Sequence, residues 1–440
     1  MIPQFELYDA CLLIIYLFVI YLVAILYTQK RQKENSIYRY FIPGLSIKLA
    51  GGIIYAFYHV YIYKGGDTFV FYNAASDLVS YVSIFEPYTF GAYWNVFDSS
   101  VHDFSPMYNY ILNGPDVLFM VKLTSFTYCL GAGSYYTVTL LFSVFSFLGL
   151  WYGFLTFSKL YPQLKYYFFL AAFCVPTMVL WSSGVLKDTI TIGAIGWLIY
   201  GFANLFIFSV KPRLSLFHIV ISSVLIFMLK SYLIYLLYPA FFIWVQSNVK
   251  AKISSRFLRN ILSPLLIVSM VGALVFILTS YSENAGKYSL DNWQNTLRGF
   301  HSWHEHLANT RDQSGYTLGE MEYTFLGVLS KIPAAINVTF FRPYLWEVRN
   351  LPTLLGAFEG LILFLMFCYI LVKTRLKIIS YILKNKEALF SMLFALVFGV
   401  VVGISSYNFG ALSRYKIPAQ FFFILSLILV FFESTKTKAN

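Results

Sequence analysis

Charged residues are scarce in this chain. They make up 12% of its 440 residues, whereas soluble domains carry about 25%. Hydrophobic residues make up 59%, and the mean hydropathy is +0.67. This composition argues against a soluble domain and predicts a membrane protein with many spans.

Cysteine is also rare, and recognisable export features are missing. Cys11, Cys129, Cys174 and Cys368 all lie in apolar stretches, without the spacing of a metal site. They are predicted to be buried free thiols that act as small hydrophobic residues. The N-terminal segment MIPQFELYDA has no basic region and no small-residue cleavage site. We therefore predict that the first helix is retained and is not a signal peptide.

Long apolar runs determine the predicted fold, because about 20 apolar residues cross a bilayer. They predict an all-α, polytopic transmembrane helical bundle of about 11 spans with two long loops. The predicted spans are 10–28, 40–62, 136–157, 166–182, 189–209, 214–229, 232–247, 261–280, 353–372, 388–407 and 415–432. The predicted regions are 1–62 with two spans, the loop 63–135, 136–280 with six spans, the loop 281–352, and 353–440 with three spans and a tail.

The basic residues give the orientation. One set of segments holds 19 of the 32 lysines and arginines but only three of the 20 acidic residues; it comprises the loops 29–39, 158–165, 210–213, 248–260 and 373–387 and the tail from Glu433. Because lysine and arginine are enriched in cytoplasmic loops, the C-terminus is predicted to be cytoplasmic and the two long loops extracytoplasmic. The net charge of +12 then reflects topology, so no nucleic-acid partner is expected. Membrane lipids are the expected surroundings.

Ionisable residues gather at the predicted extracytoplasmic ends of the spans. Besides Asp67, they are Lys187, Asp188, Lys230, Arg342, Glu347, Glu359, Arg414 and Lys416. Such groups near hydrocarbon are costly unless paired or solvated, so the set predicts a shared functional cavity. For any one of them the alternative is a charge at a loop end that snorkels to water. Lys48, inside the second span, is predicted to snorkel to the cytoplasmic surface.

The residue types at these positions suit a particular chemistry. Gly65 and Gly66, in YKGGDTFVFYNAASD, allow a turn and a close approach of a ligand. Asp67, which follows them, can accept a proton from an attacking hydroxyl as a general base. The lysines and arginines are donors suited to a phosphate or pyrophosphate. A base beside a cationic phosphate site fits transfer of a sugar from a lipid phosphate, with the leaving phosphate stabilised electrostatically.

Two features of the long loops are less specific. The apolar stretch 117–130 in the first loop predicts an interfacial or re-entrant helix. His301, His304 and His306 in the second loop could line a loop that binds the acceptor, or could be part of a plain amphipathic loop. Their spacing lacks the HExxH order, so no metal site is predicted, although a divalent metal cofactor remains open.

Two motifs resemble the GT-C superfamily of polytopic membrane glycosyltransferases. GGDTFVFYNAASDL, around Asp67, resembles the acidic stretch in the first external loop of that family, and GALSRYKIPAQFFFILSLIL resembles its R-Y-x-x-P start of the terminal helix. The resemblance implies a bacterial inner-membrane enzyme with an extracytoplasmic active face and a polyprenyl-phosphate or polyprenyl-diphosphate sugar as donor. It implies Asp67 as the catalytic base and Arg414 as a contact to the lipid phosphate. The acceptor would be a glycan or a lipid-linked sugar of the cell envelope.

Three other functions stay open at this point. A polymerase of lipid-linked repeat units would use the same face and similar arginines. A transporter or flippase of an anionic lipid-linked substrate explains the cations without a base, and predicts helices broken near the bilayer midplane. A purely structural membrane component needs no external charge cluster.

Overall fold

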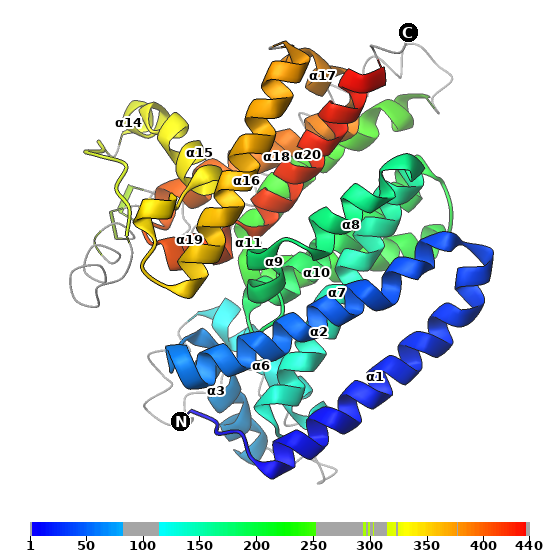
Figure 1. The fold of residues 1–440 in the computed structure, drawn as a ribbon, viewed down its shortest axis with the longest axis vertical. Coiled ribbons are helices and arrows are strands. Elements are labelled where there is room, and N and C mark those ends of the chain that lie inside the picture. The colour runs from blue at the N-terminus through cyan, green and yellow to red at the C-terminus, as the bar shows by residue number, and fades with distance from the viewer. Residues whose placement is uncertain are drawn as a thin grey trace. The chain divides into compact units, whose positions relative to one another are not determined.

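The computed structural model describes residues 2–81, 114–251, 294–295, 298–299, 302, 315–322, 324–375 and 377–436 (Figure 1). Within these ranges every regular element is a helix, and the single β-type contact is an isolated bridge between Gly315 and Asn408. The all-α prediction is confirmed for this part of the chain.

Eight helical segments of the described ranges are long and apolar enough to cross a membrane. They are Leu7–Glu34, Ser36–Tyr63, Tyr135–Leu160, Lys187–Ile207, Pro212–Gln246, Leu351–Thr374, Lys386–Ser405 and Ile417–Lys436. This confirms the membrane character and the polytopic fold. The predicted span 261–280 lies outside the described residues, and the total of 11 spans stays a prediction.

One part of the predicted span pattern differs from the structure. The segment 166–182 is not one helix, because α8 (Lys165–Phe173) ends before Pro176 and the short α9 (Pro176–Trp181) begins there. Proline cannot donate a backbone hydrogen bond and is favoured at the first turn of a helix, which explains the interruption. The segments 214–229 and 232–247 agree with the prediction, because α11 (Pro212–Ala251) consists of two helices that meet in a kink at Lys230, which has the non-helical angles φ −150° and ψ 70°.

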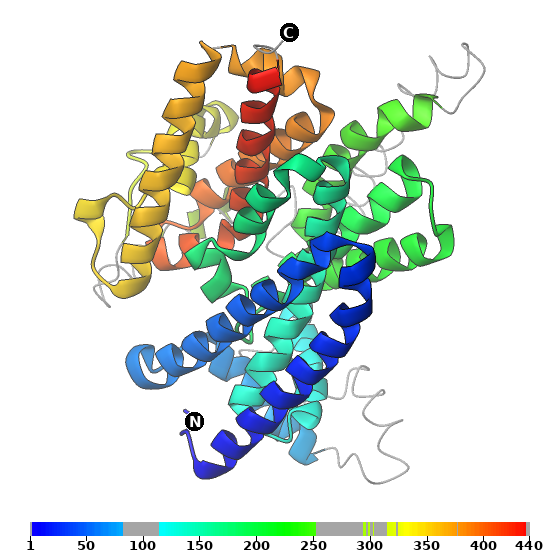
Figure 2. The same cartoon turned by 45° about the vertical axis from the view of Figure 1, so that its right-hand side comes forward.

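The described chain forms two compact units, and Figure 2 shows the helices from a second side. Unit 1 comprises residues 1–174, 179–200 and 218–231. Its complete helices are α1 (Leu7–Glu34), η1 (Ser36–Tyr40), α2 (Phe41–Phe57), η2 (Tyr58–Tyr63), α3 (Asp67–Tyr81), α6 (Pro115–Leu130), α7 (Tyr135–Leu160), η4 (Pro162–Leu164) and α8. It also holds α10 (Lys187–Phe202) up to Tyr200. In this unit α2 packs along α7 and α3 packs along α6.

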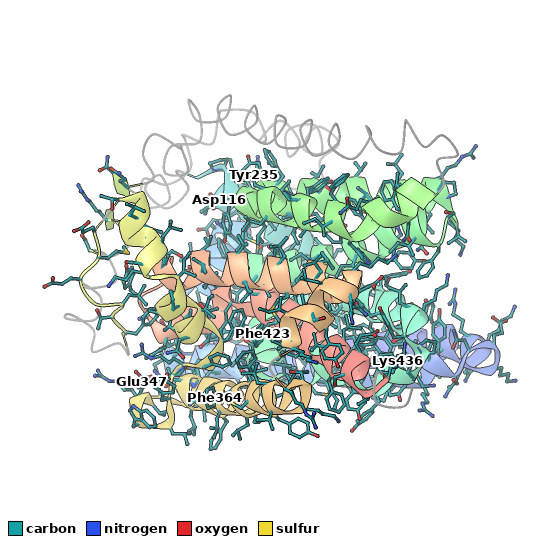
Figure 3. All side chains as sticks on the ribbon, turned by 90° about the horizontal axis from the view of Figure 1, so that it is seen from above. Asp116, Tyr235, Glu347, Phe364, Phe423 and Lys436 are labelled. Carbon is teal, nitrogen blue, oxygen red and sulfur yellow. The ribbon has the colours of Figure 1, made fainter. Side chains whose placement is uncertain are left out.

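Unit 2 comprises residues 175–178, 201–217 and 232–440. Its helices are η5 (Ala203–Ile207), α14 (Phe325–Ser330), α15 (Ile332–Phe341), η8 (Leu345–Glu347), α16 (Leu351–Thr374), α17 (Ile378–Lys384), α18 (Lys386–Ser405), α19 (Phe409–Tyr415) and α20 (Ile417–Lys436). Here α18 packs against α15 and α20, and α16 packs against α15 and α20. Phe423 of α20 is buried, whereas Phe364 of α16 is 47% exposed on the apolar outer side of its helix (Figure 3).

Small residues bring helices of unit 1 close together. A Cβ added at Gly149 of α7 would lie 2.0 Å from the backbone oxygen of Gly193 of α10. Glycine is therefore required for the two backbones to approach, as in the small-residue contacts typical of membrane helices.

The prediction about the cysteines is half right. All four cysteines are free thiols, as expected, but none is buried: Cys11 and Cys174 are exposed, and the other two are partly exposed. A side chain on the outer face of a membrane helix contacts lipid and not water, so an apolar stretch does not by itself place a thiol inside the protein.

Candidate functional site

The chain between α9 and α10 is irregular and buried. Ser182, Ser183, Gly184, Val185 and Leu186 are all buried. Non-helical backbone inside a membrane protein must have its carbonyl groups satisfied by the protein. Three side chains of unit 1 do this: Lys48 Nζ donates to Ser182 O, Ser143 Oγ donates to Ser183 O at 2.7 Å, and Thr189 Oγ1 donates to Gly184 O at 2.6 Å.

Lys48 corrects the prediction that it snorkels to the membrane surface. Its side chain is fully buried, and its ammonium group donates to Ser182 O and, at 2.7 Å, to Ser182 Oγ. The break in the helix at Ser182 supplies oxygens that a continuous helix would have used internally. This break makes it possible for a lysine to stay inside the unit.

Two ion pairs, one partly exposed and one buried, flank the start of α10. Lys187, at its first position, donates to Asp116 at 2.7 Å, and the two side chains are 12% and 26% exposed. Asp116 lies in the first turn of α6 (Figure 3), where the helix dipole favours an acidic residue. Asp188 accepts from Lys230, and these side chains are only 2% and 8% exposed. The structure therefore brings together the predicted site residues Lys187, Asp188 and Lys230, with Asp116 as an additional member.

Asp67 begins α3 in the same unit. Gly66, before it, has φ +105°, a backbone conformation that favours glycine, so the predicted turn is present. Asp67 itself is exposed, while Thr68 beside it is buried and lies within hydrogen-bond distance of Tyr135 Oη, at 2.9 Å. Phe71, one turn after Asp67, has its ring centre 5.8 Å from Lys187 Nζ. Residues one helical turn apart share a face, so the start of α3 lies on the side of the helix that meets Lys187.

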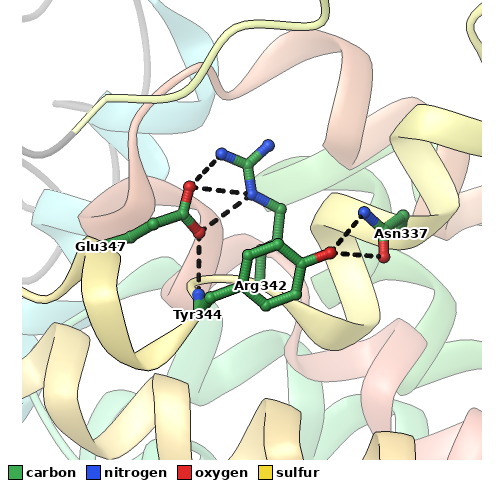
Figure 4. Close-up of polar contacts among 4 residues, drawn as sticks. All are labelled: Asn337, Arg342, Tyr344 and Glu347. Carbon is green, nitrogen blue, oxygen red and sulfur yellow. Dashed lines mark hydrogen bonds and ion pairs between the residues drawn. The ribbon is translucent and has the colours of Figure 1, made fainter.

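Arg342 and Glu347 form a second group, in unit 2 (Figure 4). Arg342 Nε donates to Glu347 Oε1 at 3.1 Å and to Oε2 at 3.0 Å, and a third contact comes from Nη2. The Tyr344 backbone N–H donates to Glu347 Oε2 at 2.8 Å, and Asn337 Nδ2 donates to Tyr344 Oη at 2.9 Å. The charge of Arg342 is thus already balanced by the carboxylate of Glu347, five residues further along the chain.

The surroundings of this pair explain its electrostatics. The guanidinium carbon of Arg342 lies 5.4 Å from the ring centre of Phe409 and 5.8 Å from that of Tyr316. Burial raises the pKa of Glu347, but the hydrogen bonds from Arg342 and from the Tyr344 backbone, together with the Arg342 charge, outweigh it. The net effect lowers the pKa of this carboxyl below its usual value.

The remaining predicted cations of unit 2 lie on and after α19. Arg414 is partly buried, with its guanidinium 5.3 Å from the ring centre of Tyr415. Lys416 is fully buried and interacts electrostatically with Glu359 of α16. The structure thus places Lys416 in the interior, near a carboxylate, and not at the protein surface.

A cavity of about 480 Å³ is present in unit 1, but it does not contain the predicted site. Its walls come mainly from α1, α2 and α7 and are almost entirely apolar, with Tyr27, Tyr152 and His218 among the few polar residues. None of the charged candidates lines it. Its chemistry is that of the bilayer interior and not that of a phosphate site.

The predicted site residues therefore fall into two groups, one in each unit. Asp67, Lys187, Asp188 and Lys230 belong to unit 1, and the arginines, Glu347 and Lys416 belong to unit 2. His301, His304 and His306 lie outside the described residues. Among the residues that are described, no cluster of histidine, cysteine, aspartate and glutamate could hold a metal ion.

Sequence reasoning missed Asp116 and did not single out Gln420 or Thr177, which the structure places beside Glu359. Asp116 carries one signal in the sequence, since it follows Gly114-Pro115 directly before an apolar run. That pattern predicts a helix start but says nothing of its lysine partner, which is 71 residues away.

Comparison of this chain with models of known protein families, with curated proteins and with solved structures finds no match.

Proposed function

We propose that the chain is an integral-membrane glycosyltransferase that moves a sugar from a polyprenyl-phosphate or polyprenyl-diphosphate donor to a hydroxyl acceptor at the bacterial inner membrane. The observation that supports this most is in unit 1: an exposed carboxylate, Asp67, starts a helix whose next turn contacts the ammonium group of Lys187. A proton acceptor and a phosphate-binding cation are the two groups that such a transfer needs.

In the proposed reaction Asp67 takes the proton of the acceptor hydroxyl. The acceptor oxygen attacks the anomeric carbon of the sugar, and the bond from that carbon to the phosphate oxygen breaks. The electron pair leaves with the lipid phosphate, whose charge Lys187 stabilises. Lys230 forms an ion pair with Asp188 at the start of α10, next to Lys187, and fixes the position of the Asp188 carboxylate.

The test compares two aspartates of α3. Asp67 and Asp77 are both exposed on this helix, ten residues apart. In purified protein given a radiolabelled polyprenyl-phosphate sugar and a membrane acceptor fraction, Asp67→Asn should lower transfer by at least about 100-fold, the contribution expected of a general base. Asp77→Asn should leave transfer within about twofold of the unchanged protein. Equal activity of the two variants would remove Asp67 from the mechanism.

The same products distinguish a polymerase of repeat units. Addition of a single sugar supports the transferase, whereas a ladder of products differing by whole repeats supports the polymerase.

One structural feature favours a transporter or flippase as the second candidate. The chain from α8 to α10 is interrupted twice, and its second interruption is the enclosed segment between Trp181 and Lys187. Discontinuous helices of this kind form substrate sites in transporters. In proteoliposomes a flippase would move a fluorescent polyprenyl-phosphate lipid between leaflets, and Asp67→Asn would not alter the rate.

A further inference from the structure

Unit 2 contains a cluster of buried polar side chains that plays no part in the proposed transfer. Glu359 of α16 is its centre and is 6% exposed, and Lys416 and Gln420 are both fully buried. The fourth member, Thr177, is also fully buried, and its backbone N–H donates to Glu359 Oε1 at 3.2 Å. Lys416 and Gln420 are one helical turn apart, so their side chains share a face.

These side chains lie close together, but several of their polar atoms fall outside the geometry of a direct hydrogen bond. Lys416 acts on the Glu359 carboxylate through its charge, and the side chains of Thr177 and Gln420 lie near enough to act on it as hydrogen-bond donors. Glu359 Oε2, Lys416 Nζ, both amide atoms of Gln420 and Thr177 Oγ1 have no partner within hydrogen-bond geometry in the part of the chain that the structure describes. Among the described residues, Glu359 Oε2 and Lys416 Nζ are the only charged atoms that are buried and unpartnered in this way.

Leaving so many polar atoms unsatisfied in one place is physically untenable. A buried donor or acceptor without a partner costs about 1–3 kcal/mol, and a charged one costs more. Five such atoms would offset most of the stability of a typical domain, which is about 5–15 kcal/mol. Groups that lie too far apart for direct contact, but near enough to interact, are commonly bridged by water.

We infer that Glu359, Lys416, Gln420 and Thr177 form an internal water-binding site, in which ordered water joins the carboxylate to the ammonium group. The chemistry of the site selects a neutral ligand that both donates and accepts hydrogen bonds. A cation is opposed by Lys416 and an anion by Glu359. Water fits, because a buried water molecule makes about three hydrogen bonds to groups that are otherwise unsatisfied.

Such water would connect three separate stretches of unit 2. Thr177 belongs to the short α9, and Glu359 lies in the interior of α16. Lys416 directly precedes α20, and Gln420 lies in its first turn. A polar network that is fully satisfied fixes the relative positions of its members, whereas a partly satisfied one destabilises them.

The direction in which two substitutions change the melting temperature tests the inference. If the site is dry, Thr177→Val and Gln420→Leu remove unsatisfied polar atoms and should raise the melting temperature of the full-length protein in lipid nanodiscs. If water fills it, each variant removes a partner of that water and should lower the melting temperature. We expect a decrease for both variants, and an increase or no change in either one overturns the proposal.

A matched control sets the scale. Thr339 is fully buried in the same unit, and its hydroxyl donates directly to Gly399 O at 2.7 Å. Thr339→Val loses a direct hydrogen bond of known geometry, so the decrease for Thr177→Val should be of similar size. A decrease less than a third as large would mean that the Thr177 hydroxyl binds nothing, and would overturn its place in the site.

Direct observation does not depend on any variant folding. An electron cryo-microscopy map of the full-length protein, at a resolution that shows ordered water, should contain density between Glu359 and Lys416. A direct carboxylate–ammonium contact with no density between the groups would overturn the inference. Density too large for water would also overturn it, because the ligand would then be of another class.

Discussion

The pair of Asp188 and Lys230 allows the most quantitative prediction, because both side chains are almost fully enclosed. They are 2% and 8% exposed. Removing one partner of a buried ion pair leaves an uncompensated charge and costs about 3–5 kcal/mol. Lys230→Met should therefore lower the free energy of unfolding by that amount. The double variant Asp188→Asn with Lys230→Met should recover at least half of the loss, because replacing both charges by neutral groups is often nearly neutral.

The pair of Asp116 and Lys187 provides the matched control within the same unit. Its side chains are 26% and 12% exposed, so solvent screens the charge that a substitution leaves behind. Lys187→Met should cost only about 1 kcal/mol. The free energies of unfolding can be measured by titration with SDS in mixed micelles, with helix content followed by circular dichroism. Equal losses for Lys230→Met and Lys187→Met would refute the argument that burial determines the cost.

Three further predictions concern other parts of the molecule. In the same titration Lys48→Met should lower the free energy of unfolding by about 1–3 kcal/mol, because the buried carbonyl of Ser182 loses its donor. Ser182→Ala keeps the bond to that carbonyl and should lower it by less than half as much. A larger loss for Ser182→Ala would contradict this explanation. Gly149→Ala should lower the free energy of unfolding by about 3 kcal/mol, because the added Cβ would lie 2.0 Å from a backbone oxygen of α10. At Gly153 the added Cβ would meet nothing closer than 3.4 Å, so Gly153→Ala should lower it by under about 0.5 kcal/mol. Because the pKa of Glu347 is lower in the folded protein than in the unfolded chain, its carboxylate contributes stability above the unfolded pKa, and this stability is lost as pH falls through the folded pKa. The melting temperatures at pH 7 and pH 3 should therefore differ less in Glu347→Gln than in the unchanged protein.

The helices could be predicted from the sequence because each one is a local pattern. An apolar run of span length is contained in one stretch of chain, and the described spans agree with the predicted ones apart from 166–182. The departure occurs where composition alone does not determine whether a helix continues. A serine- and glycine-containing stretch such as 182–184 can break a helix only when other parts of the unit satisfy its carbonyl groups.

The candidate site could be predicted only in its residue types. Lys187 and Lys230 stand out because an ionisable side chain in an apolar segment is costly. Their pairing does not stand out, because Asp116 is 71 residues from Lys187, and Asp188, although itself predicted as a site residue, is 42 residues from Lys230. Helical periodicity describes one helix at a time and does not show which helices meet. For the same reason the sequence predicted the wrong surroundings for Lys48.

These pairings also bear on how a phosphate would bind, since Lys187 already has a carboxylate at 2.7 Å. An incoming lipid phosphate would have to compete with Asp116 for the same ammonium group. Asp116→Asn removes the competing charge and should tighten binding of polyprenyl phosphate. At the partly exposed position of this pair we expect a gain of about 1 kcal/mol, which is about fivefold in affinity.

Lys187→Met removes the cation itself and should weaken binding, so the two variants should move the affinity in opposite directions. Binding of a fluorescent polyprenyl phosphate to the purified protein measures both, and the Asp116→Asn effect should shrink at high salt because exposed charges are screened. If both variants weakened binding alike, the pair would be a structural contact, and the cation in the proposed transfer would have to be sought elsewhere in unit 1.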